Sequence, residues 1–334
     1  GIWAAVQTPP IVGVTATLTR LVAGSSPSGI LMLLAAGGAL LLVVMAMALV
    51  VWYGVDGITR RPTPDPPTTP ADFDLPFEDA TFTSRDRVTL RGYWMPPRDP
   101  ACAAAVVICP GRAGSLDSDL PYAVPLCAAG YGVLIFDWRA HGRSDGRTVT
   151  LGYRERDDLR AALDWLSSRG VERIGLLGLS MGAATAIGVA ADDSRIAAVV
   201  ADSAFAQVET VIVGGLRERY VRNRLARPLA WLVLLGIGWQ AGGAVSGADP
   251  LRIVGRVAPR PLLLIHGARD PYVPMDSMFQ LYRAASAPKE LWVVPEAGHR
   301  EAAALRPKEY WARTLAFFAA WLPLQSENVA QESV

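Results

Sequence analysis

A serine flanked by glycines, Gly178-Leu179-Ser180-Met181-Gly182, is the segment with the clearest chemical potential. It follows an apolar run, residues 174–179, that predicts a buried strand, and it precedes small and apolar residues with good helix propensity. Strand, Gly-x-Ser-x-Gly and helix are typical of a nucleophile elbow, in which a sharp turn exposes the serine hydroxyl. The same five residues are also compatible with a glycine-rich turn and an incidental serine, so the rest of the chain has to decide.

A histidine and an aspartate that could work with Ser180 stand later in the chain. Asp270 and His299 each lie in a loop that follows an apolar run typical of a strand. In a Ser-His-Asp triad the histidine takes the proton of the serine hydroxyl and later delivers it to the leaving group, while the aspartate holds the imidazole in the right tautomer. We therefore expect Ser180 to be the nucleophile, His299 the base and Asp270 the acid.

Two of these roles have competitors in the sequence. The chain has three histidines, and we expect His141 and His266 to be structural. A core histidine with satisfied hydrogen bonds remains the alternative for His299. Asp202 also follows a predicted strand and competes with Asp270 for the acid, although the proline-flanked loop favours Asp270.

Predicted strands and helices alternate along the chain around these residues. A predicted hairpin, 79–83 and 88–95, is followed by buried strands expected at 104–109, 132–136, 173–179, 197–201, 262–265 and 291–294. Helices are expected between them at 121–129, 153–168, 181–191, 275–286 and 307–321. Apolar strands interleaved with helices indicate an α/β fold with a mostly parallel sheet covered on both faces. Ligands of such sheets bind at the carboxyl ends of the strands, which is where the candidate residues stand.

Residues 78–322 resemble the serine α/β-hydrolase superfamily, and within it they are similar to the membrane-anchored branch that includes Bem46-like hydrolases. Where that branch typically carries His-Gly-Asn-Ala-Gly, this chain has Pro110-Gly111-Arg112-Ala113-Gly114. The family pattern Asp-x-Arg-Gly-x-Gly-x-Ser is matched by residues 137–144, with Ala140 in place of the first glycine. The order of nucleophile, acid and base agrees as well. The resemblance implies an α/β-hydrolase fold, but it does not specify a substrate.

An oxyanion hole follows from the same resemblance. Two backbone N–H groups are expected to stabilise the tetrahedral intermediate, one from Met181 and one from the loop after the first parallel strand. By position the second donor is Arg112. Pro110 and Arg112 depart from the family pattern, but a backbone donor survives such changes. The Arg112 side chain is expected either to be solvated or to contact an anionic group of the substrate.

A long apolar stretch near the amino terminus indicates a membrane segment. Residues 30–53 carry no charge, and these 24 residues exceed the roughly 20 that span a hydrocarbon core. Trp52 and Tyr53 stand where an interfacial aromatic belt would begin. A cleaved signal peptide is the alternative, with a small-x-small site at residues 46–48, but the apolar run continues past that site. We expect an uncleaved single-pass anchor.

The charges beside the apolar stretch and the prolines after it predict its orientation in the membrane and the segment that follows. Arg60 and Arg61 follow the segment and only Arg20 closely precedes it, which favours a cytoplasmic catalytic domain by the positive-inside rule. Residues 54–71 are expected to be a proline-rich linker. No role is assigned to residues 1–29. The hydrolase domain is expected at 72–322, and the polar tail 323–334 is expected to be disordered.

Residues 206–249 interrupt the alternation and predict a lid. A basic piece, 217–227, precedes an apolar piece, 228–245, that contains Trp231 and Trp239. A membrane crossing in the apolar piece would place Asp270 and His299 on the opposite side from Ser180. We therefore expect helices that line an apolar substrate pocket, with an ordinary cap packed on the domain as the alternative.

Composition narrows the classes of function. The 334 residues are 51% hydrophobic and carry a net charge of +1, which leaves no electrostatic footprint for nucleic-acid binding. Cys102, Cys109 and Cys127 are odd in number and lack metal-ligand spacing, so neither a disulfide framework nor a zinc site is indicated. No metal or organic cofactor is implied. Oligomeric state is left open.

The expected function is that of a membrane-anchored serine hydrolase that cleaves ester or thioester bonds through an acyl-enzyme on Ser180. A small-molecule or lipid-like acyl substrate fits the anchor and the apolar lid. Among enzymatic functions, the alternative is a serine aminopeptidase-like peptidase, because such peptidases share the fold and the motifs. Among non-enzymatic functions, the alternative is a catalytically silent binding member of the fold.

Overall fold

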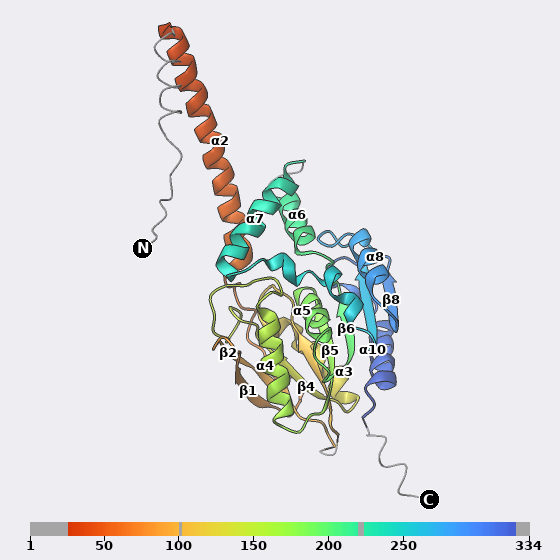
Figure 1. The fold of residues 1–334 in the computed structure, drawn as a ribbon. Helices are drawn as coiled ribbons and strands as arrows, with labels where there is room; N and C mark the ends of the chain where they lie inside the picture. The colour runs from red at the N-terminus through yellow and green to blue at the C-terminus, as the bar shows by residue number, and fades with distance from the viewer. Residues whose placement is uncertain (1–25, 100–101, 220–223, 325–334) are drawn as a thin grey trace, which may run out of the picture. The chain divides into compact units, whose positions relative to one another are not determined.

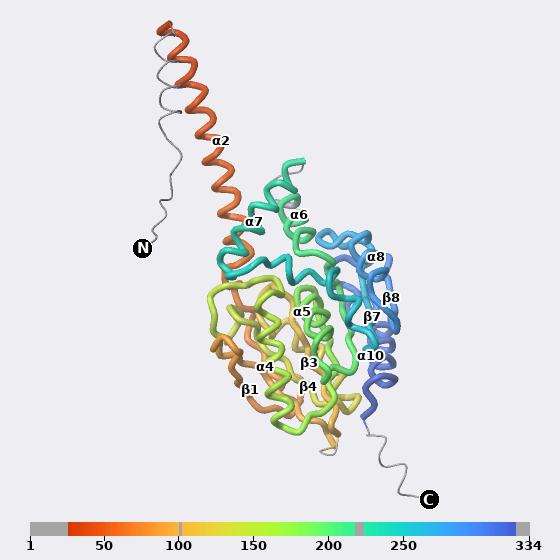
Figure 2. The backbone as a smooth tube through the Cα atoms, in the orientation of Figure 1, coloured from red at the N-terminus to blue at the C-terminus, as the bar shows by residue number. Residues whose placement is uncertain are grey.

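The computed structural model describes residues 26–99, 102–219 and 224–324. The chain divides into two units, Gly1–Val50 and Val51–Val334. Figure 1 shows the fold, and Figure 2 follows the backbone in the same orientation. The predictions for residues 1–25 and for the tail from 325 onward lie outside the described residues.

Helix α2, Pro27–Thr59, contains the predicted anchor segment. Its most apolar window of 18 residues has a mean hydropathy of 2.7, and no residue of that window is buried in the part of the chain that the structure describes. By length and composition the helix can cross a membrane, and it is equally compatible with a signal anchor or a signal peptide.

The helix continues beyond the segment predicted for it. Residues 54–59, which were expected to begin the linker, form its last turns and belong to the second unit. Gly54 packs on Val233, and Val55 packs on Gly236. These contacts explain why the helix continues past residue 53. They bury part of its last turns, although the glycines and the aspartate there interrupt the apolar pattern of the sequence.

The proline-rich stretch after α2 is fixed along the domain. Asp65 and Ser115 exchange two hydrogen bonds, in which the Asp65 N–H donates to Ser115 Oγ at 3.0 Å and the Ser115 N–H donates to Asp65 Oδ2 at 2.9 Å. The Thr68 N–H donates to Asp117 Oδ1 at 2.7 Å. The stretch is therefore a strap on the surface of the domain, and not a free spacer.

The second unit is built on an eight-stranded sheet, and it confirms the predicted α/β-hydrolase architecture. The strand order is β1-β2-β4-β3-β5-β6-β7-β8. Strands β1 and β2 pair antiparallel, β2 pairs antiparallel with β4, and every other neighbouring pair is parallel. The bounds are β1 Glu78–Thr83, β2 Thr89–Met95, β3 Ala104–Cys109, β4 Gly132–Phe136, β5 Arg173–Leu179, β6 Ile196–Asp202, β7 Leu262–Gly267 and β8 Lys289–Val294.

Helices cover both faces of this sheet, as Figure 1 shows. On one face, α3 and α10 share a buried core with the strands, in which Leu126 and Phe318 pack with Ile108. On the other face, α5 packs on β5 and β6 and is flanked by α4. The bounds are α3 Ala123–Ala128, α4 Glu155–Ser167, α5 Met181–Ala190, α8 Met275–Ala284, α9 Ala302–Leu305 and α10 Pro307–Trp321, with a 3-10 helix, Leu116–Tyr122, before α3. Because both faces are covered, the central strands are continuous apolar runs.

The lid is a helical insertion between β6 and β7. It consists of α6, Val208–Arg219, α7, Ala226–Ala241, and a 3-10 turn, Val245–Ala248. The tube in Figure 2 follows the chain up through α6 and back through α7 before it re-enters the sheet. One side of α7 is buried, whereas Trp231 and Trp239 are exposed. The short 3-10 turns Pro250–Arg252 and Val254–Arg256 lead from the lid to β7.

Candidate functional site

Ser180 stands on a sharp turn at the carboxyl end of the central strand β5. Its φ of 53° and ψ of −112° fall outside the favoured regions for a non-glycine residue. The backbone there is held by a 2.8 Å hydrogen bond from the Ser180 N–H to the carbonyl of Asp202, the last residue of the neighbouring strand β6. The strained turn aims the hydroxyl out of the sheet edge.

The two glycines of the motif are required by close packing. A Cβ on Gly178 would lie 2.5 Å from the Cα of Ala183 in the following helix. A Cβ on Gly182 would overlap the carbonyl oxygens of Cys109 and Pro110 at the end of β3. Without side chains at these positions, β5 and α5 meet directly, and α5 reaches the loop after β3.

Asp270, His299 and Ser180 form one chain of hydrogen bonds. His299 Nε2 lies 2.9 Å from Ser180 Oγ, and His299 Nδ1 lies 2.6 Å from Asp270 Oδ2. Oδ1 of Asp270 accepts the N–H groups of Tyr272 and Val273 at 2.8 and 2.9 Å, which fixes the carboxylate in its loop. The structure therefore brings together the three side chains that the sequence selected, from the loops after β5, β7 and β8.

The burial of these groups suits proton transfer. The Asp270 side chain is fully buried and that of His299 is 20% exposed, so the imidazole faces both the acid and the substrate side. The Tyr272 ring meets the His299 ring edge-on, with centroids 5.4 Å apart. A fixed carboxylate on Nδ1 leaves Nε2 to accept the serine proton.

Asp202, the competing acid, is placed differently. Its side chain is completely buried, and its Oδ1 accepts the hydroxyl of Ser203 at 2.9 Å. Oδ2 has no hydrogen-bond partner among the described residues. Burial raises the pKa of this carboxyl to about 6. The imidazole of His299 is hydrogen-bonded to Asp270, and no hydrogen bond joins it to Asp202 among the described residues.

The other two histidines hold loops. His266 is buried, and its Nε2 lies 2.9 Å from the carbonyl of Val273, beside the loop of the acid. Burial lowers the pKa of His266. His141 lies between two backbone carbonyls, with Nδ1 2.8 Å from Arg139 O and Nε2 2.7 Å from Arg112 O. Both rings support loops that border the site.

The two expected oxyanion donors lie on adjoining segments. Met181 is the first residue of α5, so its N–H has no intrahelical partner. Arg112 stands in the loop after β3, whose backbone touches Gly182. That loop is fixed by the Gly111 N–H donating to Asp119 Oδ2 at 3.0 Å and by Trp138 Nε1 donating to Pro110 O at 2.9 Å.

The Arg112 side chain has a role that its place in the sequence did not predict. Its guanidinium donates to the carbonyls of Gly57 and Ile58 at the end of α2, with 2.7 Å from Nη2 to Ile58 O. Helix C-termini leave carbonyls unpaired and carry negative partial charge, so an arginine is a suitable cap. The expectation of a solvated or substrate-binding guanidinium is corrected accordingly. No pattern in the sequence identifies this pairing, because its acceptors are backbone carbonyls more than 50 residues away along the chain.

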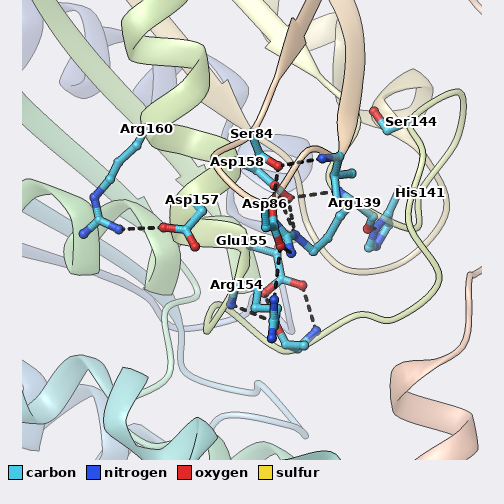
Figure 3. Close-up of polar contacts among 12 residues, drawn as sticks. Ser84, Asp86, Arg139, His141, Ser144, Arg154, Glu155, Asp157, Asp158 and Arg160 are labelled. Atoms are coloured by element: carbon cyan, nitrogen blue, oxygen red, sulfur yellow. Dashed lines mark hydrogen bonds and ion pairs between the residues drawn. The ribbon is translucent and has the colours of Figure 1, made fainter. Parts of the chain in front are cut away.

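A buried ion-pair network supports the loop after β4 (Figure 3). Arg139 is 4% exposed at its side chain and pairs with Asp158 of α4, which is fully buried, at 2.7 Å. Its other guanidinium nitrogen pairs with Asp86 at 2.7 Å. Arg139 holds the pKa of Asp86 well below its usual value. Since His141 of this loop binds Arg112 O, the network indirectly steadies the loop after β3 as well.

Replacing Arg139 by methionine is expected to lower the free energy of unfolding by about 3–5 kcal/mol, because Asp158 is left as an unpaired buried charge. Urea unfolding followed by circular dichroism measures this. The matched control is Arg160→Met, which breaks the partly exposed pair with Asp157 that Figure 3 also shows. That change is expected to cost at most about 1 kcal/mol. Equal losses in the two variants would contradict a special role for the buried network.

The described residues contain no group of three or more histidine, cysteine, aspartate and glutamate side chains arranged to hold a metal ion. The three cysteines are free thiols. Cys109 is fully buried, and burial raises its pKa well above the usual value.

Comparisons with known proteins agree with this geometry. The model of the alpha/beta hydrolase fold matches residues 104–227. The uncharacterized protein YqkD of Bacillus subtilis (strain 168) is 31% identical over 215 residues, which cover 63% of this chain and 68% of YqkD. The uncharacterized protein YfhR of Escherichia coli (strain K12) is 30% identical over 234 residues, which cover 67% of this chain and 74% of YfhR.

Among solved structures, the Pyrococcus furiosus esterase Pf2001 superposes with a TM-score of 0.66 at 28% sequence identity. The match covers 79% of this chain and 98% of the esterase. The Gly-x-Ser-x-Gly turn, the sheet order and these relatives point the same way, and the chain belongs to the α/β-hydrolase fold family.

Proposed function

We propose that this protein is a serine hydrolase that cleaves esters or thioesters through an acyl-enzyme on Ser180. The observation that carries the proposal is the continuous hydrogen-bonded chain from Ser180 Oγ through His299 to Asp270, at 2.9 and 2.6 Å. This geometry supports the roles of Ser180 as nucleophile, His299 as base and Asp270 as the residue that orients the base, because acyl transfer requires such an arrangement.

The proposed mechanism has two half-reactions. Ser180 Oγ attacks the substrate carbonyl while His299 Nε2 takes its proton, and the N–H groups of Met181 and Arg112 bind the oxyanion that forms. His299 then protonates the departing alcohol or thiol, which leaves the acyl group on Ser180. A water molecule, deprotonated by the same imidazole, then attacks the acyl carbonyl. When the bond from the acyl group to Ser180 Oγ breaks, the imidazolium returns its proton to Oγ and the acid is released.

Ester chemistry is favoured by the likeness to the esterase Pf2001. One observation supports the peptidase alternative. A cavity of about 510 Å³ lies between the lid and α8 and includes Tyr272 in its wall. Glu209 and Asp276 line that cavity, and their carboxylates are suitable partners for a peptide ammonium group. Arg217 and Arg227 line it as well, and they oppose the binding of a cation.

The membrane assignment is part of the proposal. Residues 30–53 of α2 are proposed as an uncleaved anchor. The last turns of α2, the proline-rich strap that continues to residue 71, and the hydrolase domain 72–322 with the lid 206–249 follow it. Arg60 and Arg61 favour a cytoplasmic position of that domain. Membership of the Bem46-like branch is proposed on the same motifs. Amino-terminal sequencing of the membrane-extracted protein distinguishes the anchor from a signal peptide cut near residue 48.

A substrate panel tests the reaction class. We expect p-nitrophenyl esters to be hydrolysed with a kcat/KM at least about a hundredfold above that of aminoacyl p-nitroanilides, because Arg217 and Arg227 oppose the binding of a substrate ammonium group in the cavity between the lid and α8. Each substrate is assayed with the full chain in phosphatidylcholine vesicles. Faster cleavage of the anilides would overturn the ester assignment and support the peptidase.

A further inference from the structure

A cavity of about 170 Å³ lies where the end of α2 meets the lid helix α6. Tyr53, Gly57 and Ile58 of α2 line one side, and Val211, Gly215 and Leu216 of α6 line the other. All of these residues belong to the second unit of the chain. The space is open to solvent on part of its boundary, so a ligand group can enter it from outside.

The cavity adjoins the proposed catalytic machinery at two points. Arg112, whose backbone N–H is the proposed oxyanion donor, lies in its wall, and so does Tyr272, whose ring packs against His299. The guanidinium of Arg112 is engaged with the α2 carbonyls Gly57 O and Ile58 O. The remaining described residues of the wall are apolar or glycine apart from the Tyr53 and Tyr272 hydroxyls. The space therefore favours an uncharged, apolar group.

Two glycines leave this space open. A Cβ on Gly57 or on Gly215 would meet no heavy atom within 4 Å. Neighbouring glycines behave differently, because a Cβ on Gly54 would lie 2.8 Å from the Val233 side chain and one on Gly236 would lie 2.6 Å from that of Val55. Gly54 and Gly236 thus permit close packing of α2 on α7, whereas Gly57 and Gly215 face empty space. Helix interiors disfavour glycine, so these two positions cost stability without a packing benefit.

We propose that this cavity binds the acyl chain of the substrate, and that Gly57 and Gly215 determine the chain length accepted. The inference rests on the proposed ester hydrolysis at Ser180. A cavity of about 150 Å³ accommodates a ring of six carbons, so this one suits an acyl group of roughly six carbons. The last turn of the predicted membrane helix thereby forms part of the substrate site, and the preferred substrates are short- to medium-chain acyl esters.

The test fills the cavity from either side. Gly57→Leu and Gly215→Leu are compared with the unchanged chain, as full-length protein in phosphatidylcholine vesicles, on p-nitrophenyl acetate and p-nitrophenyl hexanoate. We expect kcat/KM for hexanoate to fall about ten- to hundredfold in each variant, and that for acetate to stay within about threefold. Leucine has a higher helix propensity than glycine, so both variants are expected to fold, and their melting temperatures check this.

Gly247→Leu is the matched control. Gly247 also belongs to the lid, and a Cβ there would also meet no heavy atom within 4 Å, but the residue does not line the cavity. The change is expected to leave the ratio of hexanoate to acetate unchanged. Folded Gly57→Leu and Gly215→Leu proteins that keep the original ratio, or that lose both substrates equally, would overturn the acyl-site proposal. Failure of the unchanged chain to react with a fluorophosphonate at Ser180 would instead overturn the proposed hydrolase function.

Discussion

Replacement of Ser180 by alanine is expected to reduce ester hydrolysis by about 10⁴- to 10⁶-fold and to abolish labelling by a fluorophosphonate probe. Ser180 Oγ is 2.9 Å from the imidazole that would take its proton, and alanine removes the nucleophile without adding bulk to the strained turn. The residual rate reports what the oxyanion donors and substrate binding contribute alone. In-gel fluorescence after probe treatment and initial rates on p-nitrophenyl esters measure the two effects.

Ser168→Ala supplies the control for that experiment. Ser168 is an exposed residue just after α4, where its hydroxyl donates to the carbonyl of Trp165. This variant is expected to label and to turn over like the unchanged chain. If the unchanged chain does not label while it is folded, the hydrolase assignment fails and a catalytically silent member of the fold is the better description.

Asp270→Asn is expected to lower kcat by about 10⁴-fold with a smaller change in KM. Asp270 accepts the Nδ1 proton of His299 at 2.6 Å, and an asparagine in its place stabilises the wrong tautomer and no longer supports the imidazolium. The two backbone bonds from Tyr272 and Val273 can still be accepted by an amide oxygen, so the loop should persist. Steady-state kinetics on a p-nitrophenyl ester give the result.

Asp202→Asn distinguishes the two carboxylates. Its kcat is expected to stay within about tenfold of the original, because Asp202 binds Ser203 and not the imidazole of the triad. A larger loss in this variant than in Asp270→Asn would transfer the acid role to Asp202.

The Asp202→Asn change is also expected to alter how the free energy of unfolding depends on pH. Burial raises the pKa of Asp202 from 3.8 to about 6, so the folded state holds this proton more tightly than the unfolded state. The resulting stabilisation is complete below about pH 4 and is lost as the pH rises to about 6, on the order of 3 kcal/mol at most. Asp202→Asn is expected to flatten that dependence in urea unfolding measured from about pH 4 to pH 7.

The central sheet was predictable from sequence because its strands are covered on both faces. Strands β3, β4 and β5 begin and end where the apolar runs 104–109, 132–136 and 173–179 do. Strand β7 extends to Gly267, two residues beyond its prediction, because backbone pairing with β8 continues through residues that look like loop. The side chains selected for the triad were predictable for a related reason, since the ends of parallel strands share one edge of the sheet.

The end of α2 was not predictable in the same way. Its last turns carry Gly54, Asp56 and Gly57, which break an apolar pattern, and they are stabilised by contacts with lid residues far away in the sequence. The cap that Arg112 places on the end of α2 could not be predicted either. Its acceptors are backbone carbonyls, which every residue carries, so the sequence does not distinguish them. Tertiary contacts of this kind decide structure where local propensity is weak.

The shared wall between α2 and α6 has a thermodynamic consequence. A ligand held by both helices binds more weakly when they separate, and by reciprocity an occupied cavity must hold the helices together more strongly than an empty one. Forces that act on the apolar helix, such as a bilayer thicker or thinner than its hydrophobic length, would then shift the apparent affinity for substrate. In the proposed anchored hydrolase, the physical state of the membrane would then act on the acyl site through a single helical turn.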